Sequence, residues 1–318
     1  MASGGAGNAG SAGKGTAGAS GGATAGSGGI VASGGKGGAS AGGGTGQAGS
    51  SSGGSGGAMQ SSGCGTGAPK SGRFSIDVGG MMREYILAVP TDYEASKPYR
   101  LIFGWHPLGG SAQQVAGNGN SGYYGLQSQA NGSAIFVAPE GLPFSGNSLG
   151  WGNSNGQDIA FLEAMLARFR AELCIDESRI FSTGFSFGVM FSFAAGCSPG
   201  GMMRAIAPQA GNIQVSRCED GDRPVAVMGF HGVDDTVVGI DGGRDGRDVF
   251  VERNGCGQTT MPVTPSWCDG LSASNQPCEC VSYQDCEPGY PVIWCEFKGP
   301  HTPAPNSGAT IWNFFSQF

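Results

Sequence analysis

Histidine, charge and long hydrophobic runs are all scarce in this chain. Only 3 of its 318 residues are histidines, and 13% are charged. No apolar run approaches the length of a membrane span, and no secretory signal is visible near Met1. Acidic side chains outnumber basic ones by 24 to 17, so the net charge of -7 disfavours a nucleic-acid partner. We therefore expect neither a membrane span nor nucleic-acid binding.

Bulky side chains are almost missing from the first fifth of the chain. Residues 1–62 are mostly Gly, Ala, Ser and Thr, and such a segment cannot bury enough apolar area to offset the entropy lost on ordering. We predict a disordered tether over 1–62, which connects to an upstream anchor or module. All Phe, Trp and Tyr residues lie in 63–318, which is long enough for one catalytic domain.

Cysteine, in contrast, is plentiful: the chain has ten cysteines, and all of them lie in the part that is predicted to fold. An even number favours disulfides and an oxidising, extracellular location, so the protein is predicted to be secreted or displayed at the cell surface. We expect a leader to have preceded Met1 and to have been removed. The densest group lacks paired C-x-x-C spacing and a nearby histidine, so no metal site is expected at Cys268, Cys278, Cys280 and Cys286.

The most specific motif is the G-x-S-x-G pattern of Gly184–Gly188, which centres on Ser186. A β-prone run, Arg179–Thr183, precedes it, and an apolar run that can begin a helix, Val189–Ala195, follows. This layout predicts a nucleophile elbow in an α/β-hydrolase, with Ser186 as the nucleophile. Other copies of the pattern lack these flanks and occur around Ser20, Ser40, Ser51, Ser55, Ser148 and Ser154.

A serine nucleophile needs a histidine base, which an acid orients. In α/β-hydrolases the order is nucleophile, acid and base, so the base must follow Ser186. His231 ends an apolar strand and two carboxylates follow it within four residues, so we interpret it as part of the turn that presents the acid. His301, in a Pro/Gly loop, is then the base. The residues alone leave Asp234 and Asp235 equally suited as the acid.

An oxyanion hole needs two N–H donors. The amide of Phe187, directly after the nucleophile, is the first. The second should follow the strand that ends at Trp105; Pro107 has no N–H, so Leu108 is preferred and Gly109 comes second. His106 either pins this loop through its ring nitrogens or contacts substrate, and the sequence leaves both roles open.

From Cys64 to Phe318 the chain resembles secreted feruloyl esterases of carbohydrate esterase family 1, particularly the fungal type D group. The resemblance implies an α/β-hydrolase fold with a mostly parallel central sheet flanked by helices, no cofactor, and cleavage of ferulic esters from xylan side chains. By position it makes Ser186 the nucleophile, Asp235 the acid and His301 the base, and it pairs Cys256 with Cys286. The segments that carry it are 131–141, 150–153, 156–161, 181–188, 231–235, 253–256, 299–303 and 314–318.

The chain departs from the family pattern in two places. Val189 stands where members usually have a second glycine, and 257–280 looks like an insertion with added cysteines. Whether this insertion forms a disulfide-stapled flap that alters substrate choice is left open by the sequence. The aromatic acyl group needs a flat apolar slot, and Trp151 is a candidate wall, with core packing as the alternative. Asp158 begins a helix over 157–172, where it stabilises the helix dipole; it is given no catalytic role.

The expected substrate is therefore a feruloylated polysaccharide or a small aromatic ester. Two other classes of esterase share the triad but bind aliphatic acyl groups: polyhydroxyalkanoate depolymerases and acetylxylan esterases. A surface binding module with a vestigial site is the non-enzymatic alternative. The presence of Ser186, Asp235 and His301 together weighs against that alternative.

Overall fold

The computed structural model describes residues 58–67, 70–117, 119–214, 218, 221, 223–264, 266–269 and 278–318. Positions 1–57 of the predicted tether lie outside the described residues. Two of the last positions of that segment, Gln60 and Ser61, contact the folded part. The Ser61 side chain is buried and donates a hydrogen bond to the Leu173 carbonyl (2.6 Å), and Gln60 forms a β-bridge with Asp176.

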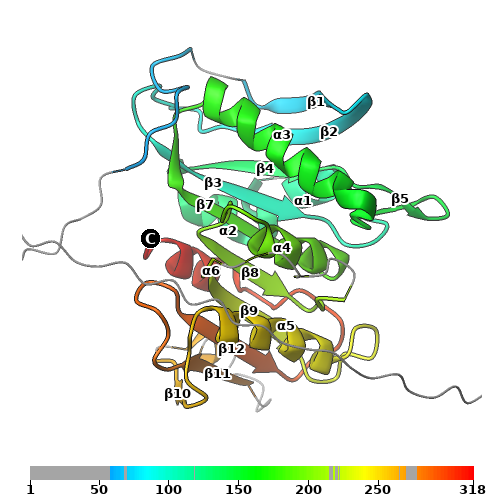
Figure 1. Ribbon diagram of the computed structural model, residues 1–318, viewed down its shortest axis with the longest axis vertical. Helices are drawn as coiled ribbons and strands as arrows, with labels where there is room; N and C mark the ends of the chain where they lie inside the picture. The colour runs from blue at the N-terminus through cyan, green and yellow to red at the C-terminus, as the bar shows by residue number, and fades with distance from the viewer. Residues whose placement is uncertain are drawn as a thin grey trace, which may run out of the picture. The chain divides into compact units, whose positions relative to one another are not determined.

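The described strands form one large sheet and one small hairpin (Figure 1). The hairpin is β5 (Leu142–Ser145) and β6 (Ser148–Gly150). The strands of the large sheet are β1 (Gly72–Val78), β2 (Met81–Ala88), β3 (Tyr99–Trp105), β4 (Ala134–Pro139), β7 (Ile175–Phe185), β8 (Ala205–Gln209), β9 (Ala226–Gly232), β10 (Thr260–Pro262), β11 (Cys278–Tyr283) and β12 (Val292–Phe297).

The strand order in the large sheet is β1-β2-β4-β3-β7-β8-β9-β12-β11-β10. The pairings from β4 through to β12 are all parallel, whereas the pairings at both edges are antiparallel. Strand β3 shows why the centre is parallel: Leu101 and Phe103 pack into one core and Ile102 into the other. A strand that buries both faces needs helices on both sides, which parallel crossovers supply.

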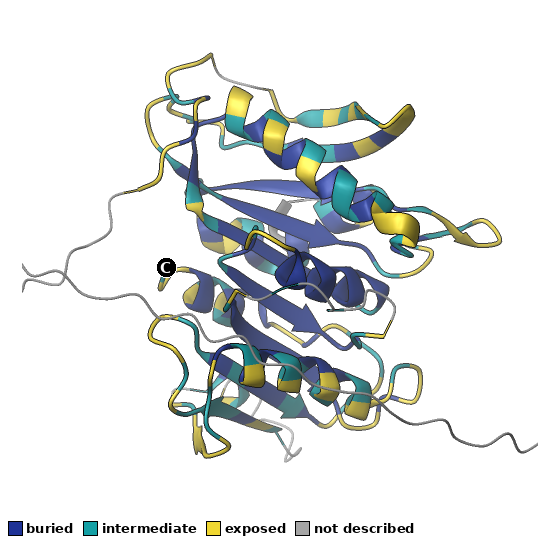
Figure 2. Ribbon diagram, viewed as in Figure 1, coloured by how far each residue is buried: buried dark blue, intermediate teal, exposed yellow. Residues whose placement is uncertain are grey.

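Helices cover both faces of the sheet (Figures 1 and 2). Residues of α3, α4 and α5 belong to one core cluster, and residues of α1, α2 and α6 belong to the other. This arrangement is the predicted α/β-hydrolase fold with a mostly parallel sheet. The helices are α1 (Ala112–Ala116), α2 (Leu126–Ala130), α3 (Gln157–Glu172), α4 (Phe187–Cys197), α5 (Ile240–Arg253) and α6 (Gly308–Phe315), with 3-10 turns at Gly119–Gly125 and Ser154–Gly156.

All ten cysteines are paired in disulfides. The pairing of Cys256 with Cys286, implied by the family resemblance, is confirmed. Cys280 and Cys295 face each other on neighbouring antiparallel strands, so sheet register brings their side chains together. The full set is Cys64–Cys174, Cys197–Cys218, Cys256–Cys286, Cys268–Cys278 and Cys280–Cys295.

The predicted insertion over 257–280 lies partly outside the described residues, at 265 and 270–277. Its described part is attached to the sheet rather than projecting as a flap, because β10 pairs with β11. Trp267 is 6% exposed, and its ring meets Phe230 and Phe297 edge to face. Its indole N–H also donates to the Pro305 carbonyl (3.0 Å), so the insertion supports the loop that follows β12.

Candidate active site

The residues predicted for the triad and the oxyanion hole lie just after β3, β7, β9 and β12, four strands of the parallel part of the sheet. The carboxyl ends of parallel strands meet at one edge, which is where α/β proteins place their sites. Ser186 joins β7 to α4 with φ 57° and ψ -120°, a strained conformation typical of a nucleophile elbow. A Cβ at Gly188 would lie 2.3 Å from the Trp105 carbonyl oxygen, so only glycine allows this close crossing.

A continuous hydrogen-bonded chain joins the three residues predicted as the triad. His301 Nε2 lies 2.8 Å from Ser186 Oγ, and His301 Nδ1 lies 2.6 Å from Asp235 Oδ2. An ionised carboxylate can only accept, so Nδ1 carries the proton and Nε2 is free to accept from the serine hydroxyl. The sequence pattern thus led to three side chains that the fold brings into contact.

The two neighbouring aspartates differ in their surroundings. Asp234 forms an ion pair with Lys298 (2.7 Å), and its side chain is 45% exposed. The Asp235 side chain is fully buried, and its Oδ1 accepts from the amides of Val237 and Val238, both at 2.9 Å. Burial alone would raise the pKa of Asp235, but the hydrogen bonds from His301 and from these two amides outweigh burial and lower it. Asp235 therefore stays ionised where it faces the histidine.

His231 does more than shape the turn. It is fully buried, and its Nε2 lies 2.8 Å from the Val238 carbonyl oxygen and 3.2 Å from Asp235 Oδ2. Burial lowers the pKa of His231, although Val238 and Asp235 act to raise it. Asp235 is thus held by two histidines. The four-residue spacing from His231 to Asp235 was the sequence signal for this contact.

The two predicted oxyanion donors have suitable backbone positions. Phe187 is the first residue of α4, and N–H groups in a first helical turn have no intrahelical partner. Gly109, the second choice in its loop, already donates its N–H to the Leu149 carbonyl (2.8 Å). Within the described residues the Leu108 N–H makes no hydrogen bond. Phe187 and Leu108 stay the predicted pair.

Trp151 does not form a substrate wall, which corrects that expectation. Its side chain is 0% exposed, and its indole N–H donates to the His106 carbonyl (2.9 Å). Its ring packs edge to face on Trp105 and stacks on Phe191, with centroids 5.1 and 5.4 Å apart. The alternative reading, a core tryptophan, is the one the structure supports.

An open cavity of about 250 Å³ lies beside the loops that carry the predicted site residues instead. It was missed because three separate segments supply its lining: Pro107, Gln114, Val115, Tyr124, Phe185 and Pro303. Phe185 directly precedes the nucleophile, and its ring lies 4.8 Å from the His301 ring. Pro107 directly precedes Leu108, so the cavity borders both the predicted nucleophile and a predicted oxyanion donor. The sequence signal that could have indicated these lining residues is that Phe185 and Pro107 stand directly next to the predicted site residues Ser186 and Leu108.

Val189, the departure from the family pattern, is accommodated by a glycine in the next loop. Its side chain is 1% exposed. A Cβ on Gly211 would lie 2.4 Å from Val189 Cβ, so a side chain at position 211 would clash with Val189. The missing side chain at Gly211 provides the space that a glycine at position 189 would otherwise have provided. The branched residue therefore fits at the start of α4.

Known proteins resemble this chain in sequence and in fold. No family model matches it. A probable feruloyl esterase C from Aspergillus terreus is 41% identical over 74% of this chain and 84% of its own length. A feruloyl esterase D from Neurospora crassa is 38% identical over 76% of this chain and 84% of its own length.

A solved structure of an acetyl xylan esterase from Aspergillus awamori has a TM-score of 0.55 and 14% identity, over 77% of this chain and 99% of that one. At that identity the likeness bears on the fold alone. The two sequence relatives exceed 30% identity and are covered over most of their length. This chain therefore belongs to the feruloyl esterase family.

Proposed function

We propose that this protein is a secreted serine esterase that hydrolyses feruloyl esters of plant cell-wall polysaccharide. The observation that carries the proposal is the chain of hydrogen bonds from Ser186 through His301 to Asp235. Five disulfides favour an oxidising, extracellular setting. No described helix is long and apolar enough to cross a membrane.

The first half-reaction transfers the acyl group to the enzyme. His301 Nε2 takes the proton of Ser186 Oγ as that oxygen attacks the ester carbonyl carbon. The carbonyl oxygen becomes negatively charged and accepts hydrogen bonds from the Phe187 and Leu108 amides. Asp235 stabilises the imidazolium of His301. When the tetrahedral intermediate collapses, the bond to the sugar oxygen breaks, and His301 gives that oxygen its proton.

The second half-reaction releases the acid. A water molecule occupies the place that the sugar alcohol left, and His301 removes its proton as it attacks the acyl carbon. The second tetrahedral intermediate uses the same two amide donors. Its collapse breaks the bond to Ser186 Oγ, which recovers its proton from His301, and the free hydroxycinnamic acid departs.

The cavity of about 250 Å³ is the site that we assign to the aromatic acyl group. Val115, Phe185 and Pro303 give it an apolar lining suited to a planar ring. Gln114 lines it as well and is exposed, so its amide can bond to oxygen substituents on the ring. The cavity also lies between the loops of the nucleophile and the base, so a bound ring would have its ester group near Ser186.

The test compares acyl groups on one enzyme. Hydrolysis rates are measured on methyl ferulate, acetylated xylan and hydroxybutyrate oligomers, with Ser186→Ala protein as the blank. We expect kcat/KM to be highest for methyl ferulate. A clear preference for acetyl or hydroxybutyryl esters would keep the triad and assign the protein to the aliphatic alternatives. No hydrolysis of any ester would contradict the proposal and favour a binding module.

A pair of neighbouring variants tests the cavity. Gln114→Trp fills the cavity, whereas Gln113→Trp adds the same ring at an exposed position of α1 outside the lining. We expect Gln114→Trp to lower kcat/KM for methyl ferulate more than for methyl acetate, and Gln113→Trp to change neither. Equal losses on both esters would place the aromatic group elsewhere.

A further inference from the structure

His106, whose role the sequence left open, is fully buried where β3 ends and the oxyanion loop begins. Each of its ring nitrogens has one backbone partner. Nε2 lies 2.9 Å from the Gly141 nitrogen, and Nδ1 lies 2.7 Å from the Pro107 carbonyl oxygen. A backbone N–H only donates, so Nε2 must accept from Gly141. The ring proton is therefore on Nδ1, which donates to the Pro107 carbonyl.

The Pro107 carbonyl and the Leu108 N–H belong to the same peptide group. A peptide group is planar, and in its trans form the C=O and N–H bonds point in opposite directions. Any bond that fixes the carbonyl therefore also fixes the direction of the N–H. The Pro107 oxygen has two donors, His106 Nδ1 and the Gly110 amide at 2.9 Å. Their combined effect is to turn the Leu108 N–H away from the buried ring.

We propose that His106 is a positioning residue, which aims the Leu108 amide at the oxyanion by holding the Pro107 carbonyl. The inference rests on the proposed esterase function, since it concerns the oxyanion hole of that reaction. His106 touches no reacting atom and acts only through the peptide group that follows it.

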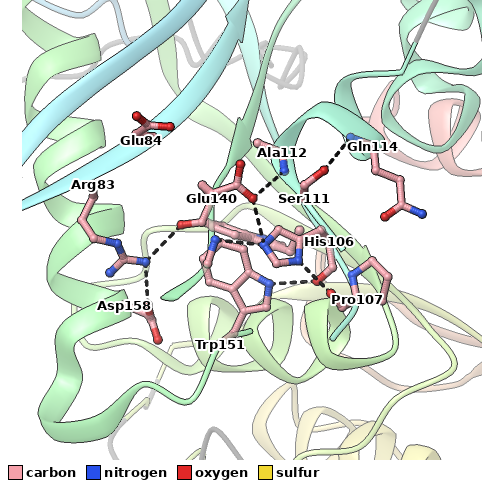
Figure 3. Close-up of polar contacts among 12 residues, drawn as sticks. Arg83, Glu84, His106, Pro107, Ser111, Ala112, Gln114, Glu140, Trp151 and Asp158 are labelled. Carbon is pink, nitrogen blue, oxygen red and sulfur yellow. Dashed lines mark hydrogen bonds and ion pairs between the residues drawn. The ribbon is translucent and has the colours of Figure 1, made fainter. Parts of the chain in front are cut away.

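The surroundings of His106 are built to keep its ring in place (Figure 3). The Trp151 indole donates to the His106 carbonyl (2.9 Å), which fixes the backbone at this residue. The Glu140 side chain lies near the His106 ring, with its Oε1 3.7 Å from His106 Nε2. The same oxygen accepts a hydrogen bond from the Ala112 amide at 3.0 Å. The carbonyl of Glu140 in turn accepts from Arg83 Nη2 (3.3 Å).

Arg83 is anchored to the start of α3. Its Nη2 donates to Asp158 Oδ1 (2.8 Å), and the exposed fractions of the two side chains are 2% and 0%. Asp158 Oδ2 accepts from the Asn153 amide, and Asn153 Oδ1 accepts from the Asp158 amide. Asp158 was expected only to stabilise the helix dipole. It also ends a buried polar network that begins at the oxyanion loop.

Two amide variants separate the two ring nitrogens of His106. In His106→Asn, the side-chain amide can occupy the Nδ1 position and donate to Pro107, but nothing replaces Nε2. In His106→Gln, the side-chain oxygen can occupy the Nε2 position and accept from Gly141, but no side-chain donor reaches the Pro107 carbonyl, which keeps only the Gly110 amide. Each variant thus loses one of the two ring hydrogen bonds, and only the Gln variant leaves the Pro107 carbonyl with one donor in place of two.

The measured quantities are kcat and KM on methyl ferulate and the affinity for phenylboronic acid. The boronic acid forms a tetrahedral adduct with a serine oxygen and places an oxygen in the oxyanion hole. Full loss of one oxyanion donor lowers kcat about 10²–10³-fold, so a misaimed donor should lower it about 10-fold or more. We expect that loss in kcat and in boronate affinity for His106→Gln, with KM nearly unchanged, and nearly wild-type values for His106→Asn.

Equal losses of kcat in the two variants, or unchanged boronate affinity in His106→Gln, would overturn the inference and leave His106 with a purely structural role. Urea unfolding of both variants provides the control, because a structural role predicts that kcat follows stability. Absence of ester hydrolysis by the wild-type protein would instead contradict the proposed function. The boronate comparison would then still decide the role of His106.

Discussion

The two halves of the proposed catalytic centre are built in different ways. The proton-transfer half consists of three side chains, Ser186, His301 and Asp235, which contact one another directly. The oxyanion half consists of backbone amides, whose directions depend on what lies behind them. Side chains that take part in a reaction can be recognised in a sequence by their residue types. Backbone amides are present at nearly every position, so those that take part can be recognised only from the contacts that orient them.

The acid of the triad offers the sharpest test of the proton-transfer half. Asp235→Asn should lower kcat on methyl ferulate about 10⁴-fold, because an amide in place of the carboxylate no longer holds the histidine in the correct tautomer. Asp234→Asn is the matched control, and its kcat should stay near the wild-type value because Asp234 pairs with Lys298 at the surface. If Asp234→Asn lowered kcat more than Asp235→Asn, Asp234 would be the acid of the triad and Asp235 would not.

The support of the oxyanion half should be visible in stability. Arg83→Met leaves the Asp158 carboxylate buried without its partner, so the free energy of unfolding should fall by about 3–5 kcal/mol. Arg73→Met is the control; Arg73 also contacts Glu140, but its side chain is 40% exposed, and loss of such a surface pair changes stability by about 0–1 kcal/mol. Urea unfolding measures both.

A double variant distinguishes the ion pair from simple packing. Arg83→Met combined with Asp158→Asn removes both buried charges and should recover part of the lost stability. If the double variant is less stable than Arg83→Met alone, the effect comes from packing of the arginine on Phe161, over whose ring its guanidinium lies at 4.3 Å. The buried charges would then not be the reason for the loss.

The smallest effect expected is a pH dependence of stability from the two buried histidines. Burial lowers the pKa of both His106 and His231. A group whose folded pKa lies below its unfolded pKa contributes stability above the unfolded value, about 6.5 for histidine, and loses it as the pH falls toward the folded pKa. The free energy of unfolding should therefore decrease below about pH 6.5.

His106→Asn removes one of these groups while keeping a donor to Pro107. Denaturation of this variant from pH 8 to pH 5 should show a shallower decline than in the wild-type protein. If the free energy of unfolding falls with pH as steeply in the variant as in the wild-type protein, His106 does not contribute to the pH dependence of stability. The lowered pKa of Asp235 acts in a separate window, since its stabilising effect disappears only below the ordinary aspartate range of about 4.

The same contrast explains what the sequence could predict. Ser186 and His301 followed from a motif with the right flanks and from the order of triad residues along the chain. The choice of Asp235 over Asp234 required the family resemblance, because both carboxylates follow the same strand. In the structure the Asp235 side chain is buried and the Asp234 side chain is exposed. The burial of two adjacent residues of the same type cannot be told apart from the sequence.

The errors and omissions lie where long-range packing decides. Trp151 follows a glycine-rich hairpin, and only the packing of its ring against Trp105 of β3 and Phe191 of α4 shows that it enters the core. The lining of the cavity comes from three separate stretches of the chain, 107–124, 185 and 303, so no single segment carries its pattern. The role of His106 depends on which backbone groups meet its two nitrogens.

The most direct test of the central claim is release of ferulic acid from feruloylated arabinoxylan by the wild-type protein and by Ser186→Ala. We predict release by the wild-type protein and loss of that release in a variant that remains folded, as judged by its unfolding transition. Equal release by both proteins would show that Ser186 is not the nucleophile. No release by either, from a well-folded preparation, would contradict the assignment of feruloyl esters as the substrate.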